Sequence, residues 1–309
     1  MNNNNQSFSD SSQSKGSQWV ERILRVVLAS QRNMSETGAK KRLIHSGKIN
    51  DNYNFPYFYL KKYKIFPYSI DGFPVGVFNS ESKGNICILY LHGGGYVDQP
   101  LPFHYKFLNE LSIETDMQIH LPLYPKSPKY TFKDTVPFVF QCYKKLLETF
   151  KSENIIVMGD SAGASIALVL SQYLKSQGFP QPKHTIMFSP CFDISLSIED
   201  NPNIDKDPMF YKALLKTNFL AYAGEEKELV NPLASPEFGD LKELAPMSVF
   251  IGTKETLYPY VQRFFEKIEK LGLDNAKCYP YFNLLHVFPL MPIPEAKDAK
   301  EKVKRIILS

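Results

Sequence analysis

A G-x-S-x-G pentapeptide, GDSAG, occupies residues 159–163, with Ser161 at its centre. A short apolar run at 155–158 precedes it, and a helix-like stretch at 164–174 follows it. A serine held on a sharp strand-to-helix turn has strained backbone angles, and its neighbours pack so closely that only glycine fits beside it. Such a turn lifts the hydroxyl clear of the sheet. The context therefore predicts that Ser161 is a nucleophile.

A second glycine-rich motif, HGGG, occupies residues 92–95 directly after the apolar run 86–91. Glycine backbone at the end of a strand can present N–H groups to a developing oxyanion. We predict an oxyanion hole formed by the backbone N–H groups of Gly93, Gly94 and Ala162. Because both motifs follow buried-type strands in the expected order, a serine hydrolase is the leading hypothesis.

The bulk composition allows one large domain and argues against several kinds of partner. Of the 309 residues, 43% are apolar and 14% aromatic, which is enough for a substantial core. The 36 basic and 32 acidic residues give a net charge of +4 without a basic block, so no nucleic-acid partner is predicted. Four cysteines lie in or beside apolar segments without C-x-x-C spacing. This favours buried reduced thiols and predicts no metal site.

The first eighteen residues are rich in Asn, Ser and Gln and nearly devoid of apolar side chains. Such a segment buries too little surface to offset chain entropy, so we predict a disordered tail at residues 1–18. It lacks the charged and apolar regions of a signal peptide, and a cytoplasmic location is the default expectation. Residues 19–27 carry apolar side chains at helical spacing. Such a stripe could lie on a membrane surface, but we expect this helix to pack onto its own domain.

From residue 57 onwards, apolar runs typical of strands alternate with helical patterns. Two strands are expected at 57–65 and 75–78, on either side of the turn residues Asp71-Gly72. Further strands are predicted at 86–91, 118–121, 155–158, 185–188, 247–251 and 277–281. Helices are predicted at 105–115, 132–150, 164–174, 260–271 and 295–307. Repeated strand–helix units predict an α/β fold with a mostly parallel, eight-stranded sheet and helices on both faces.

Residues 193–237 interrupt this alternation. They contain three prolines preceded by Asn or Asp, and a helical pattern at 211–222. An insertion after the sixth strand would lie over the carboxyl ends of the strands, where open α/β sheets bind ligands. We therefore predict one domain over residues 19–309, with a small helical cap built from about 19–50 and 194–237.

A serine hydroxyl needs a base to take its proton, and the base needs a carboxylate to hold it in the right tautomer. Two histidines follow Ser161 in the chain. His184 directly precedes a predicted strand, at the wrong end of the sheet. His286 follows the last strand, where a loop can carry it to Ser161. We predict His286 as the base.

The loop after the seventh predicted strand, residues 252–257, holds a single carboxylate, Glu255. We predict Glu255 as the acid of the triad, since the acid of this arrangement is Asp or Glu. Asp193, after the sixth strand, is the rival candidate, and Asp274 is a weaker one. The alternative for Glu255 is a structural charge that pairs with Lys254 or opens the next helix.

These motifs resemble those of the hormone-sensitive lipase family of α/β-hydrolases. The resemblance runs from about residue 86 to the C-terminus and rests on HGGGY at 92–96, GDSAG at 159–163, SP at 189–190 with Asp193, NPLASP at 231–236, ETL at 255–257 and HVF at 286–288. It implies a cofactor-free carboxylesterase for small or medium acyl esters, with cap elements that shape the pocket. The sequence departs from the family pattern at Glu255, where Asp is common, at Pro259, which replaces a second acid, and at 121–128, which lack its Arg and Glu.

An esterase that works through an acyl-enzyme is thus the leading hypothesis. An amide deacylase with the same triad stays open, as does a non-catalytic small-molecule receptor on this fold, against which His286 argues. No cofactor, metal or integral membrane segment is predicted, and a homo-oligomer is compatible with the sequence. Bulky side chains predict a pocket suited to acyl chains of about two to six carbons. They are Phe192, Met209, Phe210, Tyr211, Phe219, Tyr222 and Phe288.

Overall fold

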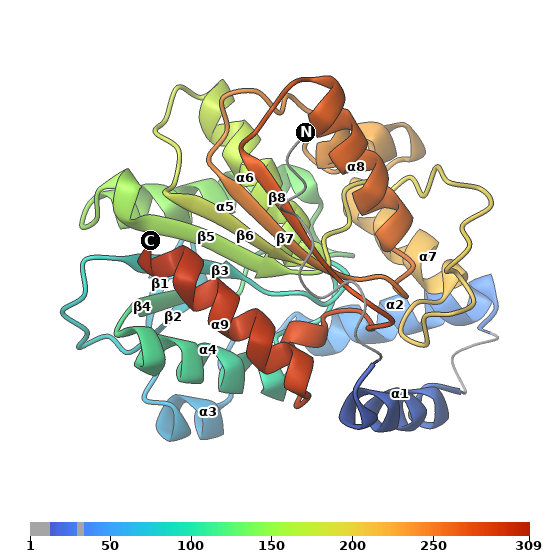
Figure 1. Ribbon diagram of the computed structural model, residues 1–309. Helices are drawn as coiled ribbons and strands as arrows, with labels where there is room; N and C mark the ends of the chain where they lie inside the picture. Colours follow the sequence, from blue (N-terminus) through green and yellow to red (C-terminus); the bar gives the residue numbers. More distant parts are fainter. Residues whose placement is uncertain (1–12, 30–33) are drawn as a thin grey trace.

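One eight-stranded sheet runs through the computed structural model, which describes residues 13–29 and 34–309 (Figure 1). The strand order is β1-β2-β4-β3-β5-β6-β7-β8. β2 pairs antiparallel with β1 and with β4, and the other neighbouring strands are parallel. The strands are β1 (Phe66–Ile70), β2 (Phe73–Phe78), β3 (Cys87–Leu91), β4 (Gln118–Pro122), β5 (Ile155–Asp160), β6 (His184–Phe188), β7 (Met247–Gly252) and β8 (Ala276–Tyr281). The predicted sheet is confirmed.

Helices cover both faces of this sheet (Figure 1). α4 (Pro102–Thr115) and α9 (Pro294–Leu308) pack on one face. α5 (Phe132–Leu147), α6 (Ala162–Ser176) and α8 (Tyr258–Lys270) pack on the other. The arrangement follows from strands that are apolar on both sides, since every residue of β3, β5 and β7 is buried.

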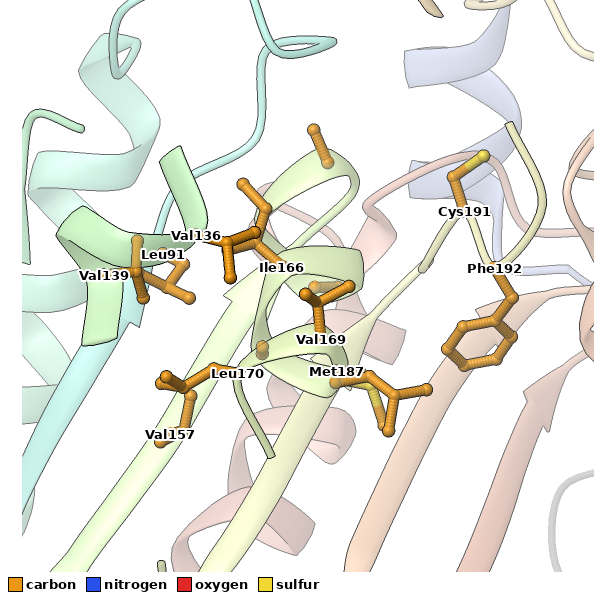
Figure 2. Packing of buried hydrophobic residues seen from close by; sticks show 14 of the residues in the cluster. Leu91, Val136, Val139, Val157, Ile166, Val169, Leu170, Met187, Cys191 and Phe192 are labelled. Carbon is orange, nitrogen blue, oxygen red and sulfur yellow. The ribbon is translucent and has the colours of Figure 1, made fainter. Parts of the chain in front are cut away.

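Successive residues of each strand point to opposite faces, so the sheet separates two hydrophobic cores. In β5, Val157 belongs to the core under α5, α6 and α8, whereas Ile156 belongs to the core under α4 and α9. Figure 2 shows the first of these cores, in which Val169 and Leu170 of α6 lie over Val157 and Met187 of the sheet. The two cores hold the sheet in place. Because β3 to β8 are parallel, the loops at their carboxyl ends lie at one edge of the sheet.

The predicted strand at 57–65 is wrong. Residues Tyr57–Lys62 form a short helix, α3, which begins directly after Pro56. The aromatic residues of this segment favour strands in general, and six residues are too few for a helical period to show. The first strand instead starts at Phe66, and the hairpin turns at Asp71-Gly72 as predicted, with both φ angles positive.

The predicted tail boundary at residue 18 is also wrong. Helix α1 (Lys15–Val27) begins four residues earlier, because Ser14 caps it by accepting a hydrogen bond from the backbone N–H of Ser17. Ser14 is itself held by Glu295 of α9, which accepts from its hydroxyl at 3.0 Å. Residues 1–12 of the predicted tail lie outside the described residues.

Three helices lie in the segments predicted to form the cap: α1, α2 (Glu36–Asn50) and α7 (Lys212–Ala223). α2 contacts α7, although they are far apart in the sequence. The expectation that α1 packs onto the domain is correct only in part: Val20 packs against the core under α4 and α9, whereas Trp19, Val26 and Val27 are exposed. Periodicity shows that a helix has an apolar side, but the tertiary structure decides what that side faces.

No helix within residues 13–29 and 34–309 is long and apolar enough to cross a membrane. All four cysteines are free thiols. Cys87, Cys142 and Cys191 are buried and Cys278 is partly buried, in line with the expected reduced thiols.

Candidate active site

Ser161 stands on the turn between β5 and α6, with φ 50° and ψ −121°. This strained conformation is held by neighbours that leave no room for side chains. A Cβ on Gly163 would lie 1.9 Å from the carbonyl oxygen of Leu91, and one on Gly159 would lie 2.6 Å from the backbone of Gly163. Both glycines of the motif are therefore sterically required, and the serine projects from the carboxyl edge of the sheet.

The structure brings Ser161, His286 and Glu255 into one hydrogen-bonded chain. His286 Nε2 lies 2.8 Å from Ser161 Oγ, and His286 Nδ1 lies 2.9 Å from Glu255 Oε2. The three residues follow β5, β8 and β7, which are neighbours or near neighbours in the sheet. Phe210 covers the imidazole, with its ring centroid 4.2 Å from that of His286. The base is thus shielded from water on that side.

Glu255 is fully buried and is held by neutral donors only. Its Oε1 accepts from the backbone N–H of Gly252 at 2.6 Å and from the hydroxyl of Ser189 at 2.8 Å. Ser189 also accepts from the backbone N–H of Val287, next to His286, at 2.9 Å. One hydroxyl therefore ties the acid loop to the histidine loop. Sequence reasoning noted Ser189 only as part of a motif and missed this function.

The acid loop is also held from the cap segment. The side-chain amide of Asn203 donates to the carbonyl oxygens of Thr253 and Glu255, both at 2.9 Å. Asp207 accepts from the backbone N–H of Thr256 at 3.1 Å. Asp207 is buried, and burial raises its pKa to about 6, an effect that nearby His286 opposes and Glu255 reinforces. Neither Asn203 nor Asp207 was predicted to hold the acid loop, because no local sequence motif indicates contacts with residues so distant in the sequence.

The rival acids lie elsewhere. Asp193 is buried, but it accepts from Ser195 and Ser197 and pairs with Arg263 at 2.8 Å. Burial alone would raise the pKa of Asp193, and these donors hold it below its usual value. Asp274 is exposed after α8. His184 begins β6 at the opposite end of the sheet, as expected, and lies 2.9 Å from the hydroxyl of Ser248.

The prediction that Gly93 serves the oxyanion hole is wrong. Its backbone N–H donates to Asp160 Oδ1 at 3.0 Å, so it is already committed. A Cβ on Gly93 would lie 2.2 Å from the same carboxylate, which explains the glycine. Gly94, Gly95 and Ala162 line the cavity beside Ser161, and Gly95 was not among the residues predicted for the oxyanion hole.

Asp160, inside the pentapeptide, holds the glycine-rich loop in place through the backbone N–H of Gly93. It also accepts from the hydroxyl of Tyr90 at 2.8 Å and lies 3.2 Å from His104 Nε2. Burial alone would raise the pKa of Asp160, but His104, Tyr90 and the Gly93 N–H together hold it below its usual value. A carboxylate with this many donors is a rigid anchor, so Asp160 positions the loop and, although it lines the cavity, is not available as a base.

A cavity of about 300 Å³ opens beside Ser161 and His286. Met209, Phe210, Tyr211 and Phe219 line it as predicted. The other three predicted wall residues pack elsewhere: Phe192 stacks on Phe264, Tyr222 stacks on Tyr96, and Phe288 packs against Tyr281. The cap segments also contribute Leu28, Arg42, Leu214, Leu215 and Asn218 to the lining. The rest comes from the glycine-rich loop, the start of α4 and the loops that carry Cys191, Leu257 and Val287.

Comparison with known proteins agrees with this fold and with an ester hydrolase. A family model described as the alpha/beta hydrolase fold matches residues 88–290. An esterase of Acinetobacter venetianus is 31% identical over 224 residues, which are 71% of this chain and 74% of that protein. The structure of an esterase from the bacterial hormone-sensitive lipase family has a TM-score of 0.79 at 22% identity, covering 96% of this chain and 98% of that one. A hormone-sensitive lipase from a metagenome library has a TM-score of 0.78 at 22% identity, with the same coverage. The chain belongs to the α/β-hydrolase family that this model describes, and its fold is similar to that of structures from the hormone-sensitive lipase family.

Proposed function

We propose that this carboxylic ester hydrolase is a serine carboxylesterase that works through an acyl-enzyme. The observation that carries the proposal is the chain from Ser161 through His286 to buried Glu255, with both links below 3 Å. Ser161 is the nucleophile, His286 the general base, and Glu255 the carboxylate that orients the imidazole. A non-catalytic receptor would have no use for a base hydrogen-bonded to a strained serine.

In the first half-reaction, Ser161 Oγ attacks the acyl carbonyl carbon while its proton passes to His286 Nε2. The oxyanion of the tetrahedral intermediate accepts hydrogen bonds from the backbone N–H groups of Gly94, Gly95 and Ala162. The imidazolium then gives its proton to the departing alcohol, which leaves the acyl group on Ser161. In the second half-reaction, water attacks the acyl carbon while His286 Nε2 takes its proton. The imidazolium then returns a proton to Ser161 Oγ as the carboxylic acid leaves. Glu255 stays ionised throughout and stabilises the imidazolium.

The cavity favours short acyl chains. Its volume is about 300 Å³, and the side chains of Met209, Phe210 and Phe219 stand in it. Each buried methylene contributes about 0.8 kcal/mol where room exists, and overpacking costs more than that. Activity should therefore rise over the first few carbons of the acyl chain and collapse where the wall is met.

The test is kcat/KM across a series of nitrophenyl esters from two to twelve acyl carbons. We expect a maximum between about two and six carbons. Met209→Ala should move the maximum to longer chains by removing part of the wall. Met291→Ala is the matched control, because Met291 is also partly buried but packs in the core under α9, away from the cavity. A wild-type maximum at ten or more carbons would contradict the proposed pocket.

A further inference from the structure

Helix α1 presents its apolar side to solvent. Trp19, Ile23, Val26 and Val27 follow one another at helical spacing, so they share one side of the helix. Their exposed fractions are 65%, 38%, 77% and 65%. Single exposed apolar residues are ordinary, but four on one helix side form a patch of the kind that marks an interaction surface.

The opposite side of α1 is polar and faces the domain. Ser17 and Glu21 are buried there. The hydroxyl of Ser17 donates to Glu295 of α9 at 3.0 Å, and Lys254 donates to Glu21 at 2.5 Å. Arg25 pairs with Glu21 and donates to the carbonyl oxygen of Lys206. These polar contacts, together with Val20, which packs against the core, fix the helix in an orientation that leaves Trp19, Ile23, Val26 and Val27 exposed.

Charge indicates what the patch binds. Lys15 and Arg22 are exposed on α1 and lie beside the apolar side, since Lys15 is four residues before Trp19 and Arg22 is four residues before Val26. The one acidic residue of α1, Glu21, is buried and paired with two cations. The exposed surface of the helix is thus apolar and basic, which is the pattern of a helix that lies in the surface of an anionic bilayer. Tryptophan is enriched at that interface.

We propose that α1 docks the protein on anionic phospholipid membranes, with Trp19, Ile23, Val26 and Val27 inserted at the headgroup level. The helix ends next to the cavity. Leu28, which follows α1, lines the cavity that contains Ser161, and its carbonyl oxygen accepts from the hydroxyl of Tyr211 at 2.8 Å. A membrane bound at α1 lies close to the mouth of the cavity, where esters dissolved in the bilayer would arrive. The docking does not depend on the proposed hydrolysis.

The chain contains one tryptophan, so its intrinsic fluorescence reports α1 directly. The full chain is mixed with vesicles of equal parts phosphatidylglycerol and phosphatidylcholine, and with vesicles of phosphatidylcholine alone. We expect a blue shift of Trp19 emission and co-sedimentation with the anionic vesicles. Binding to phosphatidylcholine should be at least about tenfold weaker, and binding to the anionic vesicles should weaken as salt is added.

Variants separate a specific patch from general stickiness. Val26→Asp should lower partitioning into anionic vesicles by about tenfold or more, because it adds a carboxylate to the inserted side. Arg22→Glu should reduce the preference for anionic over neutral vesicles. Ile113→Asp is the matched control, since Ile113 is 64% exposed on α4, outside the patch, and it should bind as the wild type does.

Three results would overturn docking at α1: no partitioning of the wild type, equal loss in Ile113→Asp, or a blue shift that follows protein concentration without lipid. The last would show that α1 pairs with a second copy of the chain. Ser161→Ala should bind vesicles normally, and Val26→Asp should hydrolyse a soluble ester normally. Failure of the docking and failure of the proposed catalysis are therefore separate outcomes.

Discussion

Two buried carboxylates lie in neighbouring loops at the edge of the sheet, yet they are balanced in opposite ways. Asp193 is paired with the guanidinium of Arg263, so its charge is neutralised by a fixed cation. Glu255 receives only neutral donors, from Ser189 and the Gly252 backbone, besides the imidazole of His286. The difference teaches that burial alone does not identify the acid of the triad. The acid is the buried carboxylate that has no Lys or Arg partner among the described residues and therefore interacts with the imidazole of His286.

The largest loss of activity is expected from substitution of Ser161 or of His286, the base that Glu255 orients. Ser161→Ala and His286→Ala are each expected to lower the rate of hydrolysis of an activated ester by on the order of 10⁵–10⁶. Because the two residues form one proton-transfer unit, the double variant should be no slower than either single variant. Steady-state kinetics with circular dichroism as a folding control measures this. A double variant slower by the product of both effects would refute the shared unit.

Exchange of the two acids tests the comparison itself. Glu255→Gln is expected to lower turnover by on the order of 10³–10⁴, because the imidazole loses its orienting charge. Asp193→Asn should instead leave turnover per folded molecule near normal and lower the free energy of unfolding by about 1–3 kcal/mol, since Arg263 loses one partner. Kinetics and urea unfolding of both variants provide the readouts. An inactive Asp193→Asn beside an active Glu255→Gln would reverse the assignment.

A third carboxylate, Asp207, sharpens the comparison through pH. Its pKa is raised by burial to about 6, above the unfolded value of about 3.8. The stability from its protonated form is fully present below about pH 4 and is lost as pH rises through about 6, a change of about 3 kcal/mol. Urea unfolding from pH 4 to 8 should show this loss in the wild type and a smaller one in Asp207→Asn. Exposed Asp205→Asn is the control, and identical profiles for both variants would contradict the buried titration.

The smallest effect is expected on the exposed side of α1. Val26→Ser should change the free energy of unfolding by no more than about 0.5 kcal/mol, because Val26 is exposed and packs against no core. Val157→Ala, in the core under α6, should cost about 1–3 kcal/mol. Thermal or urea unfolding compares them. A cost at Val26 equal to that at Val157 would show that its side chain is buried in solution.

Sequence could predict those parts of the site that depend on local constraints. The elbow at Ser161 follows from the two glycines beside it, and Glu255 is the single carboxylate in its loop. The availability of the Gly93 N–H could not be predicted, because it depends on a contact with Asp160 across the sheet edge. The orientation of α1 could not be predicted either, because the spacing of apolar residues does not indicate which side of a helix faces the domain. The prediction for α3 failed for a different reason, because six residues are too few to show a helical period.

Covalent labelling tests the central claim most directly. The wild type and the His286→Ala and Ser161→Ala variants are each treated with a fluorophosphonate ester, and the adducts are located and timed by mass spectrometry. We predict a single adduct on Ser161 in the wild type, none in Ser161→Ala, and labelling slowed by several orders of magnitude in His286→Ala. Rapid labelling of His286→Ala at Ser161, or a wild-type adduct on another residue, would contradict the proposed nucleophile and base.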